Sequence, residues 1–183
     1  MYYKILIYSL SCILISACNN DGKRIEYYDN GNIRHIRFFK NGKLDSLFQN
    51  FDSTGKLTLE LHYKNGLLNG YDRTYKNGRL KSESYFVNDN EHGMVRSWYE
   101  NGQLQCNDYR IDGYGQGIEI HYYKNGNIFS EGQNKNDART GLWKFYYENG
   151  ILEKEGIYQD GHESGVWKFY NNAGQLISEK NIH

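Results

Sequence analysis

The stretch from Gly141 to Ser164, GLWKFYYENGILEKEGIYQDGHES, contains one complete structural unit of this chain. An aromatic and aliphatic run, Leu142 to Tyr147, is followed by Asn149-Gly150. A second such run, Ile151 to Tyr158, is followed by Asp160-Gly161. Asn-Gly and Asp-Gly are strong hairpin signals, because these residues reach the positive φ angles of a tight turn at low cost. The stretch therefore predicts two strands, each ended by a turn.

Copies of this unit follow one another through the rest of the chain. Their leading glycines are spaced by 23, 24, 24 and 24 residues, at Gly70, Gly93, Gly117, Gly141 and Gly165. A fixed period in this range predicts an array whose units pack on their neighbours. Half a period suits one strand and one turn, and no segment between turn signals is long enough for three helical turns. We expect an all-β fold over residues 24–183, an elongated single-layer antiparallel meander of repeated β-hairpins.

Two columns of residues recur in the copies and are predicted to form the framework. The aliphatic column follows the first turn of each copy and consists of Leu80, Leu104, Ile128, Leu152 and Leu176. The aromatic column lies five residues after each leading glycine and consists of Tyr75, Trp98, Tyr122, Tyr146 and Tyr170. A three-residue loop with a glycine bulge would pair Tyr146 with Leu152, whereas a two-residue turn would pair Tyr147 with Leu152. The sequence leaves both registers open.

The residues two and four positions after each leading glycine lie on the opposite strand face and change along the array. In the last two copies they are Trp143, Phe145, Trp167 and Phe169. We predict that these four form an exposed apolar patch that binds a partner. The alternative is that this face covers itself at the C-terminal end. In that case the faces are reversed, and the binding site is expected around Trp98, Tyr122 and Tyr170.

The first 18 residues differ from the array. Lys4 precedes an apolar run that is short for a membrane span and ends at Ile15-Ser16-Ala17-Cys18. These four residues resemble the lipobox of bacterial lipoproteins. The resemblance implies a signal peptide over residues 1–17, cleavage between Ala17 and Cys18, a lipid on Cys18, and a short tether over residues 18–23. Cys106 would then be the one free thiol of the mature chain. An ordinary secretory signal and an uncleaved anchor are the alternatives.

The repeated motif resembles the MORN-repeat variant family of bacteria, whose units carry a Tyr-Tyr-x-Asn-Gly-x-Leu core. The best matches are TyrTyrGluAsnGlyIleLeu at 146–152, TyrTyrLysAsnGlyAsnIle at 122–128 and TrpTyrGluAsnGlyGlnLeu at 98–104. The resemblance implies an elongated meander of hairpins that serves as a binding platform. It also implies a role in immunity, because many members are described as YwqK-type antitoxins.

Charge and motif content narrow the function further. The 22 basic and 22 acidic residues balance, which leaves no basic excess for a nucleic-acid partner. The six histidines are scattered, no cysteine pair has zinc spacing, and no Gly-x-Ser-x-Gly is present, so we expect no enzyme, metal or cofactor. The sequence favours a lipid-anchored protein-interaction platform at the surface of a cell-envelope membrane, with a toxin as one candidate partner. The alternative is a module that binds carbohydrate or choline-like ligands through its Trp and Tyr rings.

Overall fold

A computed structural model of the chain describes residues 21–183, and in this range every regular element is a β-strand. The proposed signal peptide and Cys18 lie outside the described residues. The strands form one antiparallel sheet in which neighbours in the chain are neighbours in the sheet, except that the two-residue β7 pairs with β6 beside the main path. The predicted all-β meander of hairpins is confirmed.

The strands are β1 (Gly22–Tyr27), β2 (Ile33–Lys40), β3 (Lys43–Phe51), β4 (Leu57–Lys64), β5 (Leu67–Lys76), β6 (Arg79–Val87), β7 (Asn90–Glu91), β8 (Gly93–Trp98), β9 (Leu104–Ile111), β10 (Tyr114–Tyr122), β11 (Ile128–Lys135), β12 (Ala138–Tyr146), β13 (Leu152–Gln159), β14 (His162–Tyr170) and β15 (Leu176–Ile182).

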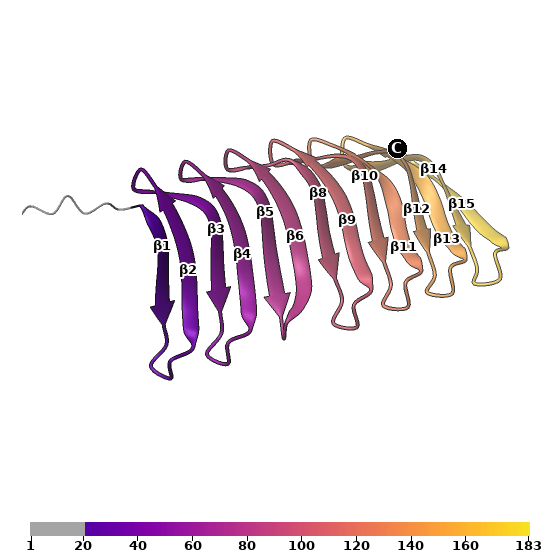
Figure 1. The fold of residues 1–183 in the computed structure, drawn as a ribbon. Helices are drawn as coiled ribbons and strands as arrows, with labels where there is room; N and C mark the ends of the chain where they lie inside the picture. Colours follow the sequence, from indigo (N-terminus) through magenta and orange to yellow (C-terminus); the bar gives the residue numbers. More distant parts are fainter. Residues whose placement is uncertain (1–20) are drawn as a thin grey trace, which may run out of the picture.

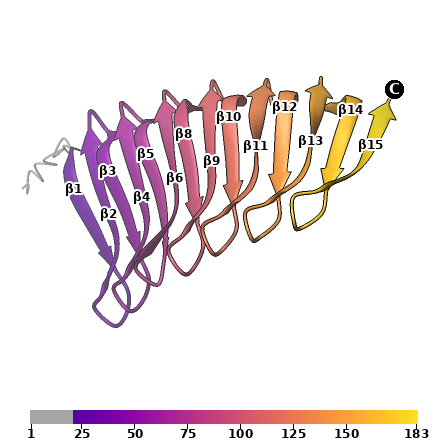
Figure 2. The same cartoon turned by 90° about the vertical axis from the view of Figure 1, so that its right-hand side faces the viewer.

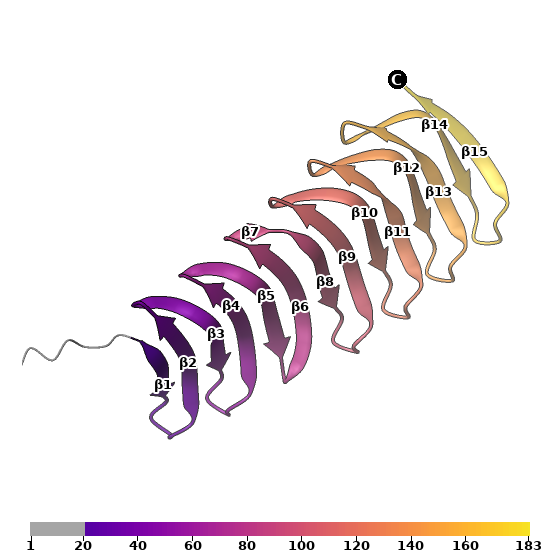
Figure 3. The same ribbon diagram turned by 45° about the horizontal axis from the view of Figure 1, so that its top comes forward.

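The hairpins stand side by side along an elongated strip, from β1 at one end to β15 at the other (Figure 1). Figure 2 shows the same strip from its side, with no second layer of structure over either face. Each strand bows along its length, so that the sheet is a shallow trough (Figure 3). A single-layer sheet has no partner layer against which to bury side chains, so its core must form among the side chains of one of its own faces.

The first turn of the unit is a three-residue loop. The amide of Gly150 donates to the carbonyl of Tyr147 at 2.8 Å, and the amide of Tyr147 donates to the carbonyl of Ile151 at 2.8 Å. Gly150 has φ 85°, the left-handed conformation that closes a type I turn with a bulge. The loop pairs Tyr146 with Leu152, which settles the open register. Three other pairs of the two columns form in the same way, Trp98 with Leu104, Tyr122 with Ile128 and Tyr170 with Leu176. Tyr75 pairs with Leu80 across a two-residue turn instead, in which Asn77 and Gly78 both have positive φ.

The Tyr-x-Asn part of the motif joins each unit to the next. The hydroxyl of Tyr147 donates to the carbonyl of Tyr170, 23 residues further on, at 2.8 Å. The side-chain amide of Asn149 donates to the carbonyl of Asn172 at 3.3 Å. Equivalent tyrosine bonds run from Tyr28 to Phe51, from Tyr99 to Tyr122 and from Tyr123 to Tyr146. The motif therefore encodes a hydrogen bond between neighbouring hairpins as well as the turn itself.

The leading glycine of each unit lies at an irregularity that adds two residues to one strand. Between β11 and β12, Glu131 pairs with Lys144 and Gln133 pairs with Thr140, so two residues of β11 span four of β12. Gly141 lies in that insertion with φ 66°. In β3 the equivalent position is Ser46, which is exposed and has φ 75°. A residue with a Cβ is strained in this conformation.

Replacing Ser46 with glycine should therefore stabilise the protein. We expect Ser46→Gly to raise the free energy of unfolding by about 0.5–1 kcal/mol, because the relief of strain exceeds the added entropy of the unfolded chain. Ser84→Gly, in the ordinary strand conformation of β6, is the matched control and should be destabilising. Urea titration of both variants measures the difference, and a destabilised Ser46→Gly would contradict the account.

Candidate binding face

The sheet has two faces of different character, because successive side chains of a strand point to opposite sides. We call the face that carries Trp143 and Phe145 the Trp face, and the face that carries Lys144 and Tyr146 the Tyr face. The two differ in burial: Trp143 is 0% exposed, whereas the preceding residue Leu142 is 48% exposed.

The core of the described chain is an aromatic cluster on the Trp face. It consists of Trp143, Phe145, Tyr158 and Trp167, with Phe169 and Ile182 packed against it. The rings of Trp143 and Phe145 stack at 6.1 Å, and Tyr158 meets Trp167 edge to face at 5.3 Å. Such ring contacts are favourable beyond the area that they bury.

Glycines on neighbouring strands make room for the two tryptophans. A Cβ atom added to Gly132 on β11 would lie 2.2 Å from the Trp143 ring, and one added to Gly156 on β13 would lie 2.2 Å from the Trp167 ring. Each indole therefore lies directly on the backbone of the adjacent strand. The indole nitrogen of Trp143 also donates to the carbonyl of Gln133 at 3.0 Å. This close approach is how a single layer buries a side chain as large as tryptophan.

Cationic side chains cover the other side of the rings. The guanidinium of Arg139 lies 4.2 Å from the centre of the Trp143 ring. The ammonium of Lys154 lies 4.7 Å from the Phe145 ring and 4.8 Å from the Trp167 ring. Both are within the range of cation–π attraction, and their aliphatic stems add cover.

The prediction that Trp143, Phe145, Trp167 and Phe169 form an exposed partner site is wrong. Trp143 and Trp167 are 0% exposed, Phe145 is 7% exposed, and Phe169 packs against them. The alternative, that this face covers itself, is the observed one. The rings are buried because Gly132 and Gly156 have no side chain, so that Trp143 and Trp167 can lie directly on the backbone of the neighbouring strands.

Truncating these rings should therefore cost stability. We expect Trp143→Ala to lower the free energy of unfolding by about 3–5 kcal/mol, because it opens a large cavity in the core. Tyr146→Ala on the Tyr face should cost less, about 1–2 kcal/mol, because that ring is only partly buried and loses mainly its 2.6 Å hydrogen bond to Glu131. Thermal and urea unfolding of both variants measures the order, and the reverse order would refute this assignment of the core.

Polar residues replace the aromatic cluster in the middle of the Trp face. One repeat before Trp143 stands Glu119, and one repeat before Gly132 stands Asp108. Cys106 on β9 pairs directly with His121 on β10, and His121 pairs with Ser130 on β11. One carboxylate oxygen of Glu119 contacts Nε2 of His121, and the other accepts from the side-chain amide of Asn134.

The pKa values of three side chains in this polar centre are shifted. Hydrogen bonds to Cys106 and Glu119 raise the pKa of His121 to about 10, against the opposing effect of burial. The same bond to His121 lowers the pKa of Glu119, helped by Asn134. Burial raises the pKa of Asp108, although Arg110 lies 3.2 Å from its carboxylate. Sequence reasoning missed this centre because His121 and Cys106 are 15 residues apart and belong to no known motif.

The Tyr face carries a row of charges that alternate in sign from strand to strand. In its N-terminal part, Arg73 lies 3.3 Å from Glu60 and 2.7 Å from Glu83. In its C-terminal part the residues paired in succession are Glu131, Lys144, Glu155, Lys168 and Glu179. Opposite charges on adjacent strands attract each other. Their pairing also helps to fix the register of the strands.

An apolar row runs beside these charges and is open to solvent. Its members in the C-terminal half are Ile118, Leu142, Ile157 and Val166, which are between 44% and 58% exposed. Leu142 pairs with Ile157 across β12 and β13. Ile118 and Leu142 also line a hollow of about 230 Å³, together with Glu131 and Lys144. Exposed apolar rows bordered by charges are typical of partner-binding surfaces.

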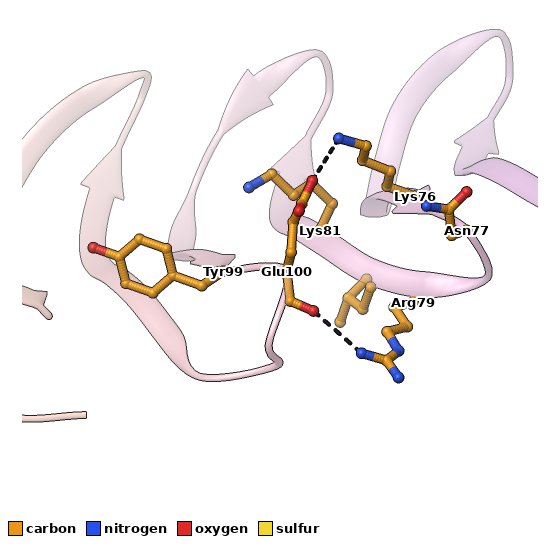
Figure 4. A pocket seen from close by; sticks show the side chains of 7 residues that line it. Lys76, Asn77, Arg79, Lys81, Tyr99 and Glu100 are labelled. Atoms are coloured by element: carbon orange, nitrogen blue, oxygen red, sulfur yellow. Dashed lines mark hydrogen bonds and ion pairs between the residues drawn. The ribbon is translucent and has the colours of Figure 1, made fainter. Parts of the chain in front are cut away.

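A second hollow, of about 330 Å³, lies where the tyrosine bond between units is missing (Figure 4). Lys76 occupies the place of the bonding tyrosine, and its ammonium pairs with Glu100 at 2.6 Å. Arg79 donates to the main-chain oxygen of Glu100, and Lys81 donates to that of Trp98. Since all three cations already have acceptors in the protein, these contacts replace the missing tyrosine bond.

Residues 21–183 contain no helix that could span a membrane. The same residues contain no group of three or more His, Cys, Asp or Glu side chains placed to hold a metal ion.

Comparison with known proteins identifies the repeat. The model of the family described as "MORN repeat variant" matches residues 20–41, 44–65, 91–107, 116–136, 139–160 and 163–182, which together exceed half of the chain. Curated proteins give no match. A solved structure described as "Crystal Structure of TarM" is 14% identical, covers 57% of this chain and 21% of its own, and has a TM-score of 0.35. MORN repeats are generally modules for interaction with proteins or lipids. This chain belongs to the MORN repeat variant family.

Proposed function

We propose that this protein is a lipid-anchored interaction platform of the cell envelope, and that a protein partner docks on its Tyr face. The observation that carries the proposal is the exposed apolar row of Ile118, Leu142, Ile157 and Val166 beside alternating charges. Apolar anchors would supply most of the binding energy, and the flanking charges would select the partner and its orientation.

The geometry of the platform favours a protein over a small ligand. The hollow at Ile118 and Leu142 is small and open, and it lies on the same face as the exposed row, as expected for a surface that meets another broad surface. The alternative of carbohydrate or choline-like binding relied on open Trp rings, and two of the three tryptophans are buried. No observation favours that alternative over the protein partner.

The docking site can be tested at Leu142. We expect Leu142→Asp to leave folding nearly intact, because the residue is about half exposed, and to weaken partner binding by about 2 kcal/mol or more. Leu176→Asp is the matched control, since Leu176 is 51% exposed but lies on the last strand, outside the row. A photo-crosslinking residue at each position then identifies the partner. Capture of the same protein equally well from position 176 would argue against the site.

The anchor is a separate part of the proposal and rests on the resemblance of Ile15-Ser16-Ala17-Cys18 to a lipobox. Diacylation of Cys18 would give stable membrane binding, whereas one acyl chain would be marginal. We expect labelled palmitate to enter the wild-type chain and not Cys18→Ser, and the wild-type protein to partition into detergent. Cys106→Ser is the control and should be labelled normally. Failure of the wild-type chain to take up label would exclude the anchor.

An immunity role is the specific form of this function that the resemblance to YwqK-type antitoxins suggests. In that form the protein crosslinked through position 142 would be a toxin, and the wild-type chain would neutralise it where Leu142→Asp would not. A captured protein without toxicity would leave the docking site in place and remove the immunity role.

A further inference from the structure

The polar centre of the Trp face contains a cysteine that the docking function does not use. Within residues 21–183 Cys106 is the one cysteine, and it is partly exposed. It lies directly across from His121, whose imidazole contacts the Glu119 carboxylate, which in turn is held by Asn134. The thiol, imidazole, carboxylate and amide thus lie next to one another over three adjacent strands.

This order of groups is the one that activates a thiol. An imidazolium beside a sulfur stabilises the thiolate, which is the nucleophilic form, and a carboxylate behind the imidazole holds its orientation and its proton. The two contacts raise the pKa of His121 to about 10, so the ring carries its charge at neutral pH. The other charged groups near the centre are Asp108, which is paired with Arg110, and Arg139, which acts on Glu119. Glu91 and Asp137 also lie within ion-pair distance of Arg110. The flanking residues Ser97 and Ser130 are uncharged.

A second, independent observation indicates that a polar group is accommodated here. Ser130 is 1% exposed and pairs with His121, yet within residues 21–183 its hydroxyl has no hydrogen-bond partner. The side-chain oxygen of Asn134, a residue that is 8% exposed, likewise has none in the described chain. Buried polar atoms are nearly always satisfied, so these two atoms on β11, next to His121 and Glu119, suggest that a polar group binds in this centre. Next to His121 there is also a hollow of about 340 Å³, lined by rings that include Tyr99, Tyr123 and Phe129.

We propose that Cys106 is a reactive thiol that forms mixed disulfides with low-molecular-weight disulfides. The Cys106 thiolate attacks one sulfur of the small disulfide, a new S–S bond forms, and the original S–S bond breaks. The electron pair of that bond leaves with the departing thiolate, while the proton stays on His121. Cys106 is oxidised and the departing half is reduced. Residues 21–183 hold no second cysteine to resolve this bond, so an external thiol is expected to remove the adduct.

The pH dependence of the reaction with an aromatic disulfide, 5,5′-dithiobis(2-nitrobenzoic acid), tests the proposal. The full chain is used, and the adduct at Cys106 is quantified on its own peptide by mass spectrometry, so that Cys12 and Cys18 do not contribute. An ordinary thiol with a pKa of about 8.5 should react about 100-fold more slowly at pH 5.5 than at pH 7.5, because its thiolate fraction falls by that factor. We expect the rate at Cys106 to fall less than about tenfold. A fall of about 100-fold, or no adduct at either pH, would overturn the proposal.

Variants separate activation from simple exposure. His121→Asn should restore the steep pH dependence of an ordinary thiol, and Glu119→Gln should move the profile part of the way. His162→Asn, a substitution of an exposed histidine on β14, is the matched control and should keep the wild-type profile. Circular dichroism checks that each variant is folded, and the wild-type profile remains decisive if His121→Asn does not fold. A folded His121→Asn with the wild-type profile would show that His121 does not activate the thiol.

Discussion

The contact of a tryptophan ring with the bare backbone of a glycine is the interaction on which the C-terminal half of this structure depends. A sheet with one layer cannot bury side chains between layers, so it must find burial within one face. Gly132 and Gly156 let Trp143 and Trp167 lie on the neighbouring strands, and Arg139 and Lys154 cover the exposed side of the rings. The resulting cluster ties β11 to β14 together more firmly than backbone hydrogen bonds alone would.

The same positions decide what each unit does. Where a glycine on one strand faces a tryptophan on the next, the Trp face forms a buried core. One repeat earlier, Asp108 and Glu119 occupy those positions, and the face becomes polar, with Cys106 and His121 beside them. The Tyr face changes less, because its charges pair from strand to strand and its tyrosines donate to the glutamates of the preceding strand. One face thus varies between an aromatic core and a polar centre, while the other is the exposed surface that we propose for docking.

Much of the fold could be predicted from the sequence because turns and period are local signals. The Asn-Gly and Asp-Gly dipeptides and the 24-residue spacing were enough to predict the hairpin array. The buried face was harder, since alternation along a strand tells which residues share a face but not which face is covered. Both faces carry aromatic rings, and the signal that distinguishes the buried face is the glycine 11 residues before each of Trp143 and Trp167.

The pairing of Cys106 with His121 could not be predicted from the sequence for another reason. The two-residue turn at Asp112-Gly113 alone would pair Cys106 with Glu119, and the irregularity near Gly117 moves His121 into that place.

Burial of Trp143 and Trp167 makes the Trp face the core and leaves the Tyr face as the surface that we propose for docking. The most direct measurement is acrylamide quenching of tryptophan fluorescence in a Trp98→Phe variant, which leaves only the two buried indoles as reporters. The account predicts a blue-shifted emission and a quenching constant far below that of the unfolded chain in urea. Quenching of the folded variant as strong as that of the unfolded chain would show that the Trp face is open to solvent and would contradict the assignment of both faces.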